Sequence, residues 1–313
     1  MDYVPQNATL ATWRNHTGPV LDAKDEFKVI DCATCGFKHV IPIPTENELA
    51  TFYREKFYLI ERKADYVQRQ QRDLDWWNRV FHERFQRFEK LLGGSGRVLD
   101  VGCGPGFFLA HGRERGWQTL GIEPSEKAAT YAQDQLGLDV HQLTLDEFSQ
   151  TGGIGQFDLV YSHGVLEHLR DPIAYLNQTR AILRSGGLAF ISVANDYNPF
   201  QTILWEHQDY PNWWLVPPEH INYFDVQSVT ELMETQGFEI VDCITTFPME
   251  LFLLMGDNYV GDDRLGSECH ARRKRFEAAL DQADRDDLKQ NIYRALASLG
   301  LGRQVEIIAR LAS

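Results

Sequence analysis

Hydrophobic positions change their spacing along the chain, and each spacing predicts a different kind of element. Short apolar runs separated by turn residues fill residues 1–60 and predict a small β-rich cap. Apolar residues at helical spacing in 61–94 predict amphipathic helices that lead into the core. In residues 95–248 strands and helices alternate, which predicts an α/β fold with a mostly parallel sheet. Residues 249–313 begin with a charged helical addition.

One strand of the central region runs directly into a glycine-rich loop. The strand is apolar apart from Asp100, and Gly102, Gly104 and Gly106 follow it before a new apolar helix begins. Because glycine has no Cβ, such a loop adopts strained dihedrals and lets a ligand approach the bare backbone. Dinucleotide-binding proteins share this feature, and a plain strand-to-helix turn is the simpler alternative.

A second strand, residues 116–122, ends next to an acidic residue. Glu123 lies about twenty residues beyond the glycines, where a carboxylate can accept hydrogen bonds from both hydroxyls of a ribose. Ser125 is then expected to cap the following helix. The longer Gly-x-Gly-x-x-Gly spacing that dinucleotide dehydrogenases favour is missing from this loop.

Four blocks in this order resemble class I S-adenosylmethionine (SAM)-dependent methyltransferases over residues 95–245; the blocks are residues 98–109, 116–125, 157–169 and 181–193. The resemblance implies a doubly wound, mostly parallel, seven-stranded Rossmann-like sheet. It also implies that residues 302–310 form a closing antiparallel strand near the sheet edge.

The same resemblance assigns the contacts with SAM. Asp100 and the glycine loop would orient the methionine end, Glu123 would hold the ribose, and the turn at 145–146 would border the adenine. The expected cofactor-binding residues are Asp100, Gly102, Gly104, Gly106, Glu123, Pro124, Leu145, Asp146, Ser162 and His163. The plain alternatives are that Asp100 caps the loop and that Asp146 caps a helix beginning at Glu147.

Residues 195–224 carry more aromatic side chains than a connecting loop needs, which predicts a lid over a substrate. A second hydrophobic cluster is the alternative. Residues 217–224 resemble the Glu-His-x-x-Tyr-Phe segment of sugar methyltransferases, including the C-methyltransferases of deoxysugar biosynthesis, where the Glu-His pair lies at the acceptor. We therefore expect His220 to take the acceptor's proton with help from Glu219, or else to position the acceptor. His168 is expected to be a hydrogen-bonded structural histidine.

The sugar methyltransferases that this chain resembles often open with a zinc domain built from two Cys-x-x-Cys pairs. Cys32 and Cys35 match the second pair, whereas the first pair is absent. His16 and His39 are the candidates to complete a site, because structural zinc takes four ligands. The alternative is a vestigial knuckle that folds without metal.

Composition narrows the range of partners. A formal net charge of −14 argues against a nucleic-acid substrate and favours a small-molecule acceptor. No apolar run approaches the roughly twenty residues of a membrane span, and the first residues lack a basic segment followed by an apolar one. We therefore expect no membrane partner and a cytoplasmic location. Five cysteines suggest free thiols or metal ligands rather than a disulfide framework.

The sequence thus predicts a SAM-dependent methyltransferase of a small molecule. A sugar or nucleotide-linked sugar is the first expectation, with O-methylation preferred slightly to C-methylation. The alternatives are a methyltransferase of a phenolic or other secondary metabolite and a SAM-binding partner subunit without catalysis. The identity of the acceptor, the atom methylated and the oligomeric state stay open.

Overall fold

The computed structural model describes residues 16–51, 66–151, 155–283 and 285–311. The first fifteen residues of the expected cap and residues 52–65, where the cap was expected to join the helical lead-in, lie outside the described residues.

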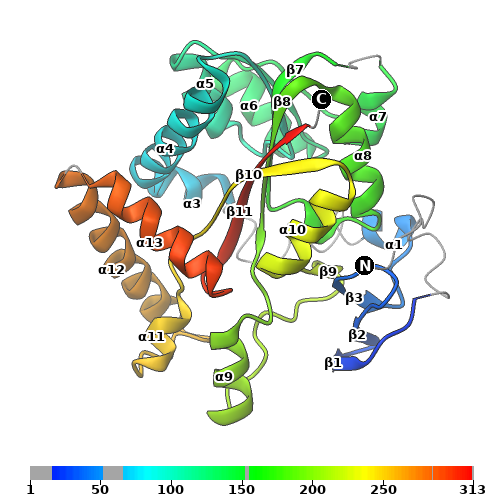
Figure 1. Cartoon of the computed structure of the whole chain (residues 1–313), viewed down its shortest axis with the longest axis vertical. Coiled ribbons are helices and arrows are strands. Elements are labelled where there is room, and N and C mark those ends of the chain that lie inside the picture. The colour runs from blue at the N-terminus through cyan, green and yellow to red at the C-terminus, as the bar shows by residue number, and fades with distance from the viewer. Residues whose placement is uncertain (1–15, 52–65, 152–154, 284, 312–313) are drawn as a thin grey trace.

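A seven-stranded sheet forms the centre of the molecule, in the order β10-β11-β8-β7-β4-β5-β6 (Figure 1). Its strands are β4 (Arg97–Val101), β5 (Gln118–Ile122), β6 (Val140–His141), β7 (Phe157–His163), β8 (Leu183–Ala194), β10 (Phe238–Thr245) and β11 (Gln304–Leu311). Neighbouring strands pair in parallel except at β11, which is antiparallel to both β8 and β10. The predicted mostly parallel, seven-stranded sheet is confirmed.

Both faces of the sheet are buried, because helices cover each of them (Figure 1). One core cluster takes the apolar faces of α4 (Leu74–Leu92), α5 (Phe107–Glu114) and α6 (Glu126–Leu136). The other takes those of α7 (Leu145–Ser149), α8 (Pro172–Ile182) and α10 (Val226–Thr235). Neighbouring strand residues alternate between the clusters: Val98 joins the first and Leu99 the second.

The remaining helices frame the carboxyl ends of the strands. They are α3 (Tyr66–Arg72), α9 (Pro199–His207), α11 (Glu250–Leu254), α12 (Asp263–Gln282) and α13 (Asp286–Ser298). Lys289 of α13 pairs with Glu83 of α4 at 2.5 Å, and Trp76 of α4 donates its indole N–H to Glu277 of α12 at 2.7 Å. These contacts hold α12 and α13 against α4.

The cap is a second, four-stranded antiparallel sheet in the order β1-β2-β3-β9. Its strands are β1 (Val20–Lys24), β2 (Phe27–Asp31), β3 (Lys38–Ile41) and β9 (Asn222–Tyr223), and α1 (Glu46–Thr51) follows β3. The fourth strand belongs to the aromatic segment of the core, so the cap's sheet is completed by a distant part of the chain. Phe37 of the cap packs on Phe224 with ring centroids 5.0 Å apart, within a core cluster shared by both parts.

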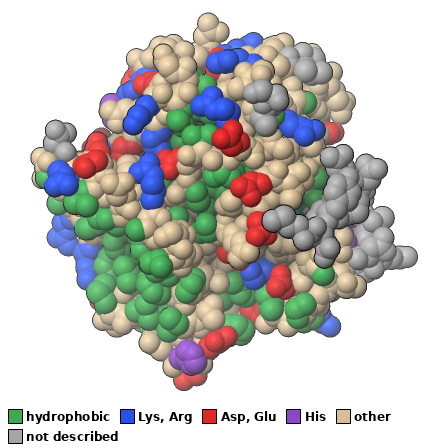
Figure 2. Space-filling view, viewed as in Figure 1, with side chains coloured by type: hydrophobic (Ala, Val, Ile, Leu, Met, Phe, Trp, Pro, Cys, Tyr) green, Lys and Arg blue, Asp and Glu red, His purple; other side chains and the backbone are tan. Residues whose placement is uncertain are grey.

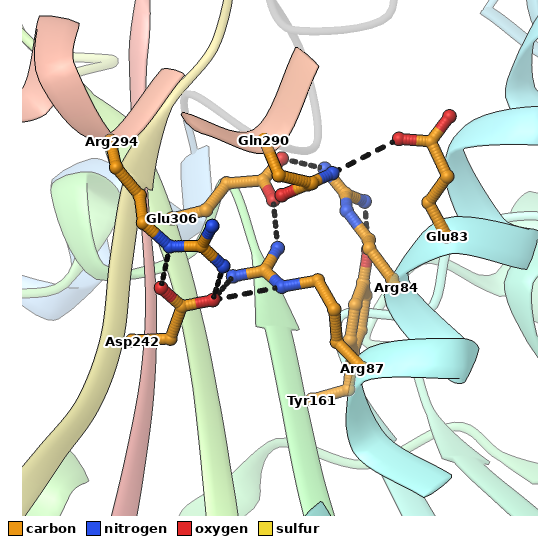
Figure 3. Close-up of polar contacts among 8 residues, drawn as sticks. All are labelled: Glu83, Arg84, Arg87, Tyr161, Asp242, Gln290, Arg294 and Glu306. Carbon is orange, nitrogen blue, oxygen red and sulfur yellow. Dashed lines mark hydrogen bonds and ion pairs between the residues drawn. The ribbon is translucent and has the colours of Figure 1, made fainter. Parts of the chain in front are cut away.

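A buried ionic network joins α4 to the sheet (Figure 3). Arg84 pairs with Glu306 of β11 at 2.5 Å and donates to the hydroxyl of Tyr161 on β7. Arg87 reaches both Glu306, at 3.4 Å, and Asp242 of β10, at 2.8 Å. Burial raises the pKa of Glu306, but the two guanidinium groups outweigh burial and hold it below its usual range.

The surface shown in Figure 2 mixes acidic and basic side chains, with hydrophobic side chains gathered over the lower left. Large hydrophobic side chains that are exposed among the described residues include Ile203, Met255, Phe276, Leu288 and Leu299. Among the described residues, no helix is both long enough and apolar enough to cross a membrane.

Candidate functional site

The glycine-rich loop joins β4 to α5 in a conformation that needs glycine. Gly102, Gly104 and Gly106 have φ values of 71°, 52° and 83°, in the left-handed region. A Cβ on Gly106 would lie 2.5 Å from Leu138 Cδ1, so the space as well as the backbone excludes a side chain there. The amide of Gly102 donates to the carbonyl of Ile122 at 2.8 Å, which fixes the loop to the end of β5.

Two acidic residues flank this loop. Glu123 accepts hydrogen bonds from the amides of Gly104, at 2.9 Å, and Ser125, at 2.8 Å, and its carboxylate keeps further lone pairs for a ligand. Asp100 is only 3% exposed at the end of β4. Burial raises the pKa of Asp100, and the nearby charge of Glu123 raises it further. The structure therefore brings the predicted methionine-binding and ribose-binding residues together at the carboxyl ends of β4 and β5.

The predicted adenine-bordering turn lies after β6 at the same edge. Leu145 is buried as the first residue of α7, whereas Asp146 is exposed and accepts a hydrogen bond from Gln178 of α8 at 2.8 Å. Thr144 caps α7 in a capping box with Glu147, so the alternative role of Asp146 as helix cap is wrong.

The other predicted cofactor residues lie at the ends of β5 and β7. Pro124 follows Glu123, and its carbonyl accepts from Gln142 at 3.4 Å. Ser162 is buried within β7. His163 ends that strand with its ring 5.8 Å from Trp77 of α4. Burial lowers the pKa of His163 to about 3, so its imidazole stays neutral at physiological pH.

A turn between β7 and α8 connects the glycine loop with a second group of polar residues. A Cβ on Gly102 would lie 2.9 Å from Val165 Cγ2, so this turn contacts the loop directly. The 3₁₀ helix η3 (Leu166–His168) follows within the turn and carries Glu167. The carbonyl of Glu167 accepts from the amide of Ile221 at 2.8 Å, which brings the segment containing His220 to the same place.

His220, which is partly buried, and the buried residues Glu167 and Asp196 form a cluster beyond the carboxyl ends of β7 and β8. Nδ1 of His220 lies 3.8 Å from Oδ2 of Asp196, which is too long for a hydrogen bond. Glu167 is 4% exposed and Asp196 is 1% exposed. His220 Nδ1, Glu167 Oε2 and Asp196 Oδ2 are all buried without a hydrogen-bond partner. Buried polar atoms are normally paired, so these three indicate a place for a polar ligand.

Electrostatics at this cluster favour a protonated histidine. Burial opposes the charged form, but the carboxylates of Asp196 and Glu167 outweigh it and raise the pKa of His220 above its usual range. Burial also raises the pKa of Glu167. The cluster can therefore accept and hold a proton at the imidazole.

His168 and Glu219 lie beside the cluster. Nδ1 of His168 donates to the backbone carbonyl of Glu219 at 2.7 Å, and the rings of His168 and His220 lie 4.9 Å apart. Glu167, His168 and His220 each offer one atom that could bind a metal ion, and these atoms all lie within 4.8 Å of one another. Glu219 ranks behind Asp196 and Glu167 in its electrostatic effect on His220.

The sequence analysis did not identify Asp196, nor Arg303 and Glu250, which lie next to it in the fold. Oδ1 of Asp196 accepts from Arg303 at 3.3 Å, and Arg303 lies 4.0 Å from the buried carboxylate of Glu250. One signal was present in the sequence, because Asp196 lies two residues after β8, a strand whose carboxyl end should face a ligand. Nothing in the sequence places Arg303 beside it.

The aromatic segment at 195–224 is partly a packing element. Trp214, Tyr223 and Phe224 are at most 2% exposed and belong to a core cluster. The hydroxyl of Tyr197 and the indole N–H of Trp214 are buried without a hydrogen-bond partner, and their rings lie 5.6 Å apart. The segment therefore encloses polar groups as well as apolar ones.

Two cysteines and two histidines converge in the cap. His16, Cys32, Cys35 and His39 are all buried, and their ligand atoms lie within 4.8 Å of one another. His16 Nδ1 lies 3.2 Å from Cys35 Sγ, 3.5 Å from Cys32 Sγ and 3.1 Å from His39 Nε2. Tetrahedral zinc with ordinary bond lengths has ligand–ligand distances of about 3.3–3.8 Å, so distances of 3.1–3.5 Å lie within a few tenths of an ångström of a zinc site.

The thiols are also prepared for a metal. A hydrogen bond from the Cys35 thiol lowers the pKa of Cys32 to about 3, and the same contact raises the pKa of Cys35. This contact favours the thiolate form of Cys32, and the thiolate is the form of cysteine that binds metals. His39 donates from Nδ1 to the carbonyl of Val40 at 2.9 Å, which turns its Nε2 toward the other ligands.

Comparison with known proteins fixes the family. A family model described as a methyltransferase domain matches residues 68–242, more than half of the chain. The chain belongs to this methyltransferase family. The predicted methyltransferase class is confirmed at this level.

Relatives of this methyltransferase differ in what they act on. A ubiquinone biosynthesis O-methyltransferase of Ruegeria sp. is 34% identical over 104 residues, which cover 32% of this chain and 41% of the relative. A tRNA U34 carboxymethyltransferase of Pseudoalteromonas translucida is 30% identical over 186 residues, which cover 55% of this chain and 53% of the relative. The chain therefore spans about half the length of these relatives.

Among solved structures, a Burkholderia thailandensis 1,6-didemethyltoxoflavin-N1-methyltransferase matches with 17% identity and a TM-score of 0.49, covering 95% of this chain and 100% of that one. That likeness is too weak to inform the acceptor of the methyltransferase.

Proposed function

We propose that this protein transfers the methyl group of SAM to a hydroxyl group of a small-molecule acceptor bound at His220, Glu167 and Asp196. The observation that supports this most is the group of three buried polar atoms without a hydrogen bond, near the turn that contacts the glycine loop. A site that is polar, enclosed and adjacent to the cofactor loop suits an acceptor that brings its own hydrogen-bonding groups.

SAM supplies a sulfonium-activated methyl group, so the protein must align the acceptor and remove its proton. The imidazole of His220 takes the hydroxyl proton as the oxygen–carbon bond forms and the carbon–sulfur bond breaks. The products are the methyl ether, S-adenosylhomocysteine and a proton held on the imidazolium. Asp196 and Glu167 stabilise that imidazolium, as their effect on the pKa of His220 indicates.

The cofactor would lie along the carboxyl edge of the sheet. Asp100 and the glycine loop would hold its methionine end, Glu123 its ribose, and the turn at Leu145 its adenine. The location of Asp100 and Glu123 on either side of the loop supports this arrangement.

A sugar or nucleotide-linked sugar is the acceptor class that we propose. Two buried carboxylates offer several acceptor lone pairs, and adjacent sugar hydroxyls would donate to them. The ring of Tyr197, the residue after Asp196, would contact the apolar face of a sugar ring.

A phenolic acceptor is the second candidate. The relatives named as O-methyltransferases of ubiquinone biosynthesis favour it, because their names place the methyl group on oxygen without pointing to a sugar. The aromatic segment would accommodate a planar ring equally well.

The test is turnover of labelled SAM with a panel of sugars, nucleotide-linked sugars and phenols by wild type and His220→Ala. We expect His220→Ala to lose roughly a hundredfold or more in kcat while its affinity for S-adenosylhomocysteine is unchanged. His82→Ala is the matched control, since His82 is exposed on α4 and bonds to Arg115 at 2.8 Å, away from the site.

Other results would redirect the proposal. Near-normal turnover by His220→Ala would remove it from proton transfer. Turnover that disappears with a chelator and returns with Mg²⁺ would make Glu167, His168 and His220 cation ligands instead. Binding of S-adenosylhomocysteine without turnover of any acceptor would favour a non-catalytic partner subunit.

The cap, we also propose, binds one zinc ion through His16, Cys32, Cys35 and His39. Four buried ligand atoms at nearly tetrahedral spacing support this, and the two histidines replace the cysteine pair that the sequence lacks.

A further inference from the structure

The cap and the acceptor site share a strand. β9 (Asn222–Tyr223) begins two residues after His220 and pairs with β3 of the cap, with His39 opposite Asn222. Beside this pair, the amide of Val40 donates to the carbonyl of Ile221 at 2.9 Å. A residue of the proposed zinc site therefore lies directly across the ladder from the segment that carries His220.

The other side of this segment is bound to the catalytic core. The amide of Ile221 donates to the carbonyl of Glu167, and the side-chain amide of Asn222 donates to the carbonyls of Leu166 and Leu169 at 3.0 and 2.7 Å. Asn222 is completely buried. The strand thus lies between the cap's β3 and the turn that carries Glu167.

Further contacts join the cap to residues on either side of β9. Lys24 of β1 donates to the carbonyl of Leu215 at 2.8 Å, and Lys38 of β3 pairs with Asp225 at 2.7 Å. These contacts begin on β1 and β3, whose relative positions depend on how well the small cap is folded.

We propose that metal binding by His16, Cys32, Cys35 and His39 holds β9 in place and thereby positions His220 and Glu167 for the acceptor. His39 links the metal site to β9. Its Nε2 lies against His16 of the metal site and its Nδ1 donates to the Val40 carbonyl, while its backbone lies opposite Asn222 of β9. This proposal rests on the proposed function. In it His39 and Asn222 are positioning residues, and the SAM-binding loop is independent of the metal.

A physical reason makes the metal the controlling element. The strands that the cap itself supplies are only four or five residues long, so a bound metal would add a cross-link that such a small sheet otherwise lacks. A two-residue strand contributes little by itself, so the alignment of β9 depends on its pairing with β3 as well as on its hydrogen bonds to the turn that carries Glu167. Without metal, two imidazoles and two sulfurs would stay buried at close range, which favours local opening of β3.

The experiment is hydrogen–deuterium exchange on the full chain, loaded with Zn²⁺ or stripped by a chelator. We expect one zinc per chain and, on removal, at least tenfold faster exchange in the peptide covering residues 216–225. Exchange in the peptide covering 98–110 and affinity for S-adenosylhomocysteine should stay within twofold. Adding Zn²⁺ back should restore the protection.

Cysteine variants test whether the change in exchange comes from loss of the metal. The double variant Cys32→Ser, Cys35→Ser should reproduce the stripped state, and Cys243→Ser on β10 should behave as wild type. If the double variant does not fold, chelation and zinc add-back on wild type decide the question. Unchanged exchange at 216–225 after zinc loss, equal changes throughout the core, or absence of bound zinc would each overturn the proposal.

Failure of this proposal can be distinguished from failure of the proposed function. Zinc content, exchange and S-adenosylhomocysteine affinity are measured without turnover, so an inactive protein with zinc-dependent protection of β9 would contradict only the proposed function. Where an acceptor is turned over, metal removal should raise KM for it at least fivefold and leave KM for SAM unchanged.

Discussion

At the scale of single residues, the neighbours of His220 decide what it can do. The sequence placed Glu219 beside it because the two are adjacent in the chain. In the fold, Asp196 and Glu167 act on its imidazole more strongly; Glu167 lies on η3 after β7, and Asp196 lies two residues after β8. Adjacency in sequence is visible in advance, whereas convergence of loops requires the tertiary structure. The glycine loop and Glu123 were predictable because their spacing reflects one strand–helix–strand unit, with the loop after β4 and Glu123 after β5.

The raised pKa of His220 predicts a particular pH dependence. A base must be deprotonated before it acts, so kcat/KM should rise with pH through an apparent pKa above 6.5. Asp196→Asn removes a carboxylate that raises this pKa, so the acidic limb should move to lower pH as the maximal rate falls. The measurement is a pH–rate profile of wild type, Asp196→Asn and the control His82→Ala. An unshifted limb in Asp196→Asn would show that Asp196 does not govern the proton acceptor.

At the scale of elements, the parallel strands and their helices were predictable because each carries its own hydrophobic period. β9 was not, since two residues have no period and their pairing with β3 is set by distant packing. The buried ions that hold α4 to β11 were equally hidden, because a charged residue within an amphipathic helix usually faces water. In the structure Arg84 is 2% exposed and faces the sheet.

Removing one partner from that network should be costly. Glu306→Gln leaves Arg84 buried without its counter-charge and should lower the free energy of unfolding by roughly 3–5 kcal/mol, measured by urea denaturation. Arg264→Ala is the control, since it breaks an exposed pair with Glu268 and should change stability by less than about 1 kcal/mol. Equal effects from the two variants would contradict a stabilising role for the buried pair.

The same network predicts part of the acid sensitivity. Because the folded-state pKa of Glu306 lies below its unfolded value, its contribution to stability is complete above the unfolded pKa near 4.3. That contribution is lost as pH falls through the lower folded pKa. Urea unfolding between pH 3 and pH 7 should show this loss in wild type and a shallower dependence in Glu306→Gln. Parallel curves for the two proteins would contradict this assignment.

At the scale of the whole molecule, three parts meet at one edge of the central sheet. The core supplies the glycine loop, the cap supplies β3, and the segment at 195–224 joins both through β9. The sequence predicted the first two parts separately. The connection between the cap and the core was not predictable, because it depends on the pairing of β3 with β9, whose residues are more than 180 positions apart in the sequence.

Zinc should stabilise the cap in proportion to its binding. Metal analysis of the purified protein should find one zinc per chain, and a chelator should lower Tm because structural metal binding contributes free energy of folding directly. Cys32→Ser should lose the metal, whereas Cys269→Ser, a buried cysteine of α12 remote from the cap, should retain it. Trace zinc with an unchanged Tm would establish a vestigial knuckle.

The central claim is that the glycine loop and Glu123 bind SAM, and calorimetric titration tests it most directly. S-adenosylhomocysteine should bind wild type and the control Glu114→Ala equally, and NAD should not bind. Glu123→Ala should weaken the binding by about 1–3 kcal/mol, because ribose hydroxyls lose their acceptor in a buried site. Tight binding of NAD with no heat from S-adenosylhomocysteine would contradict the account.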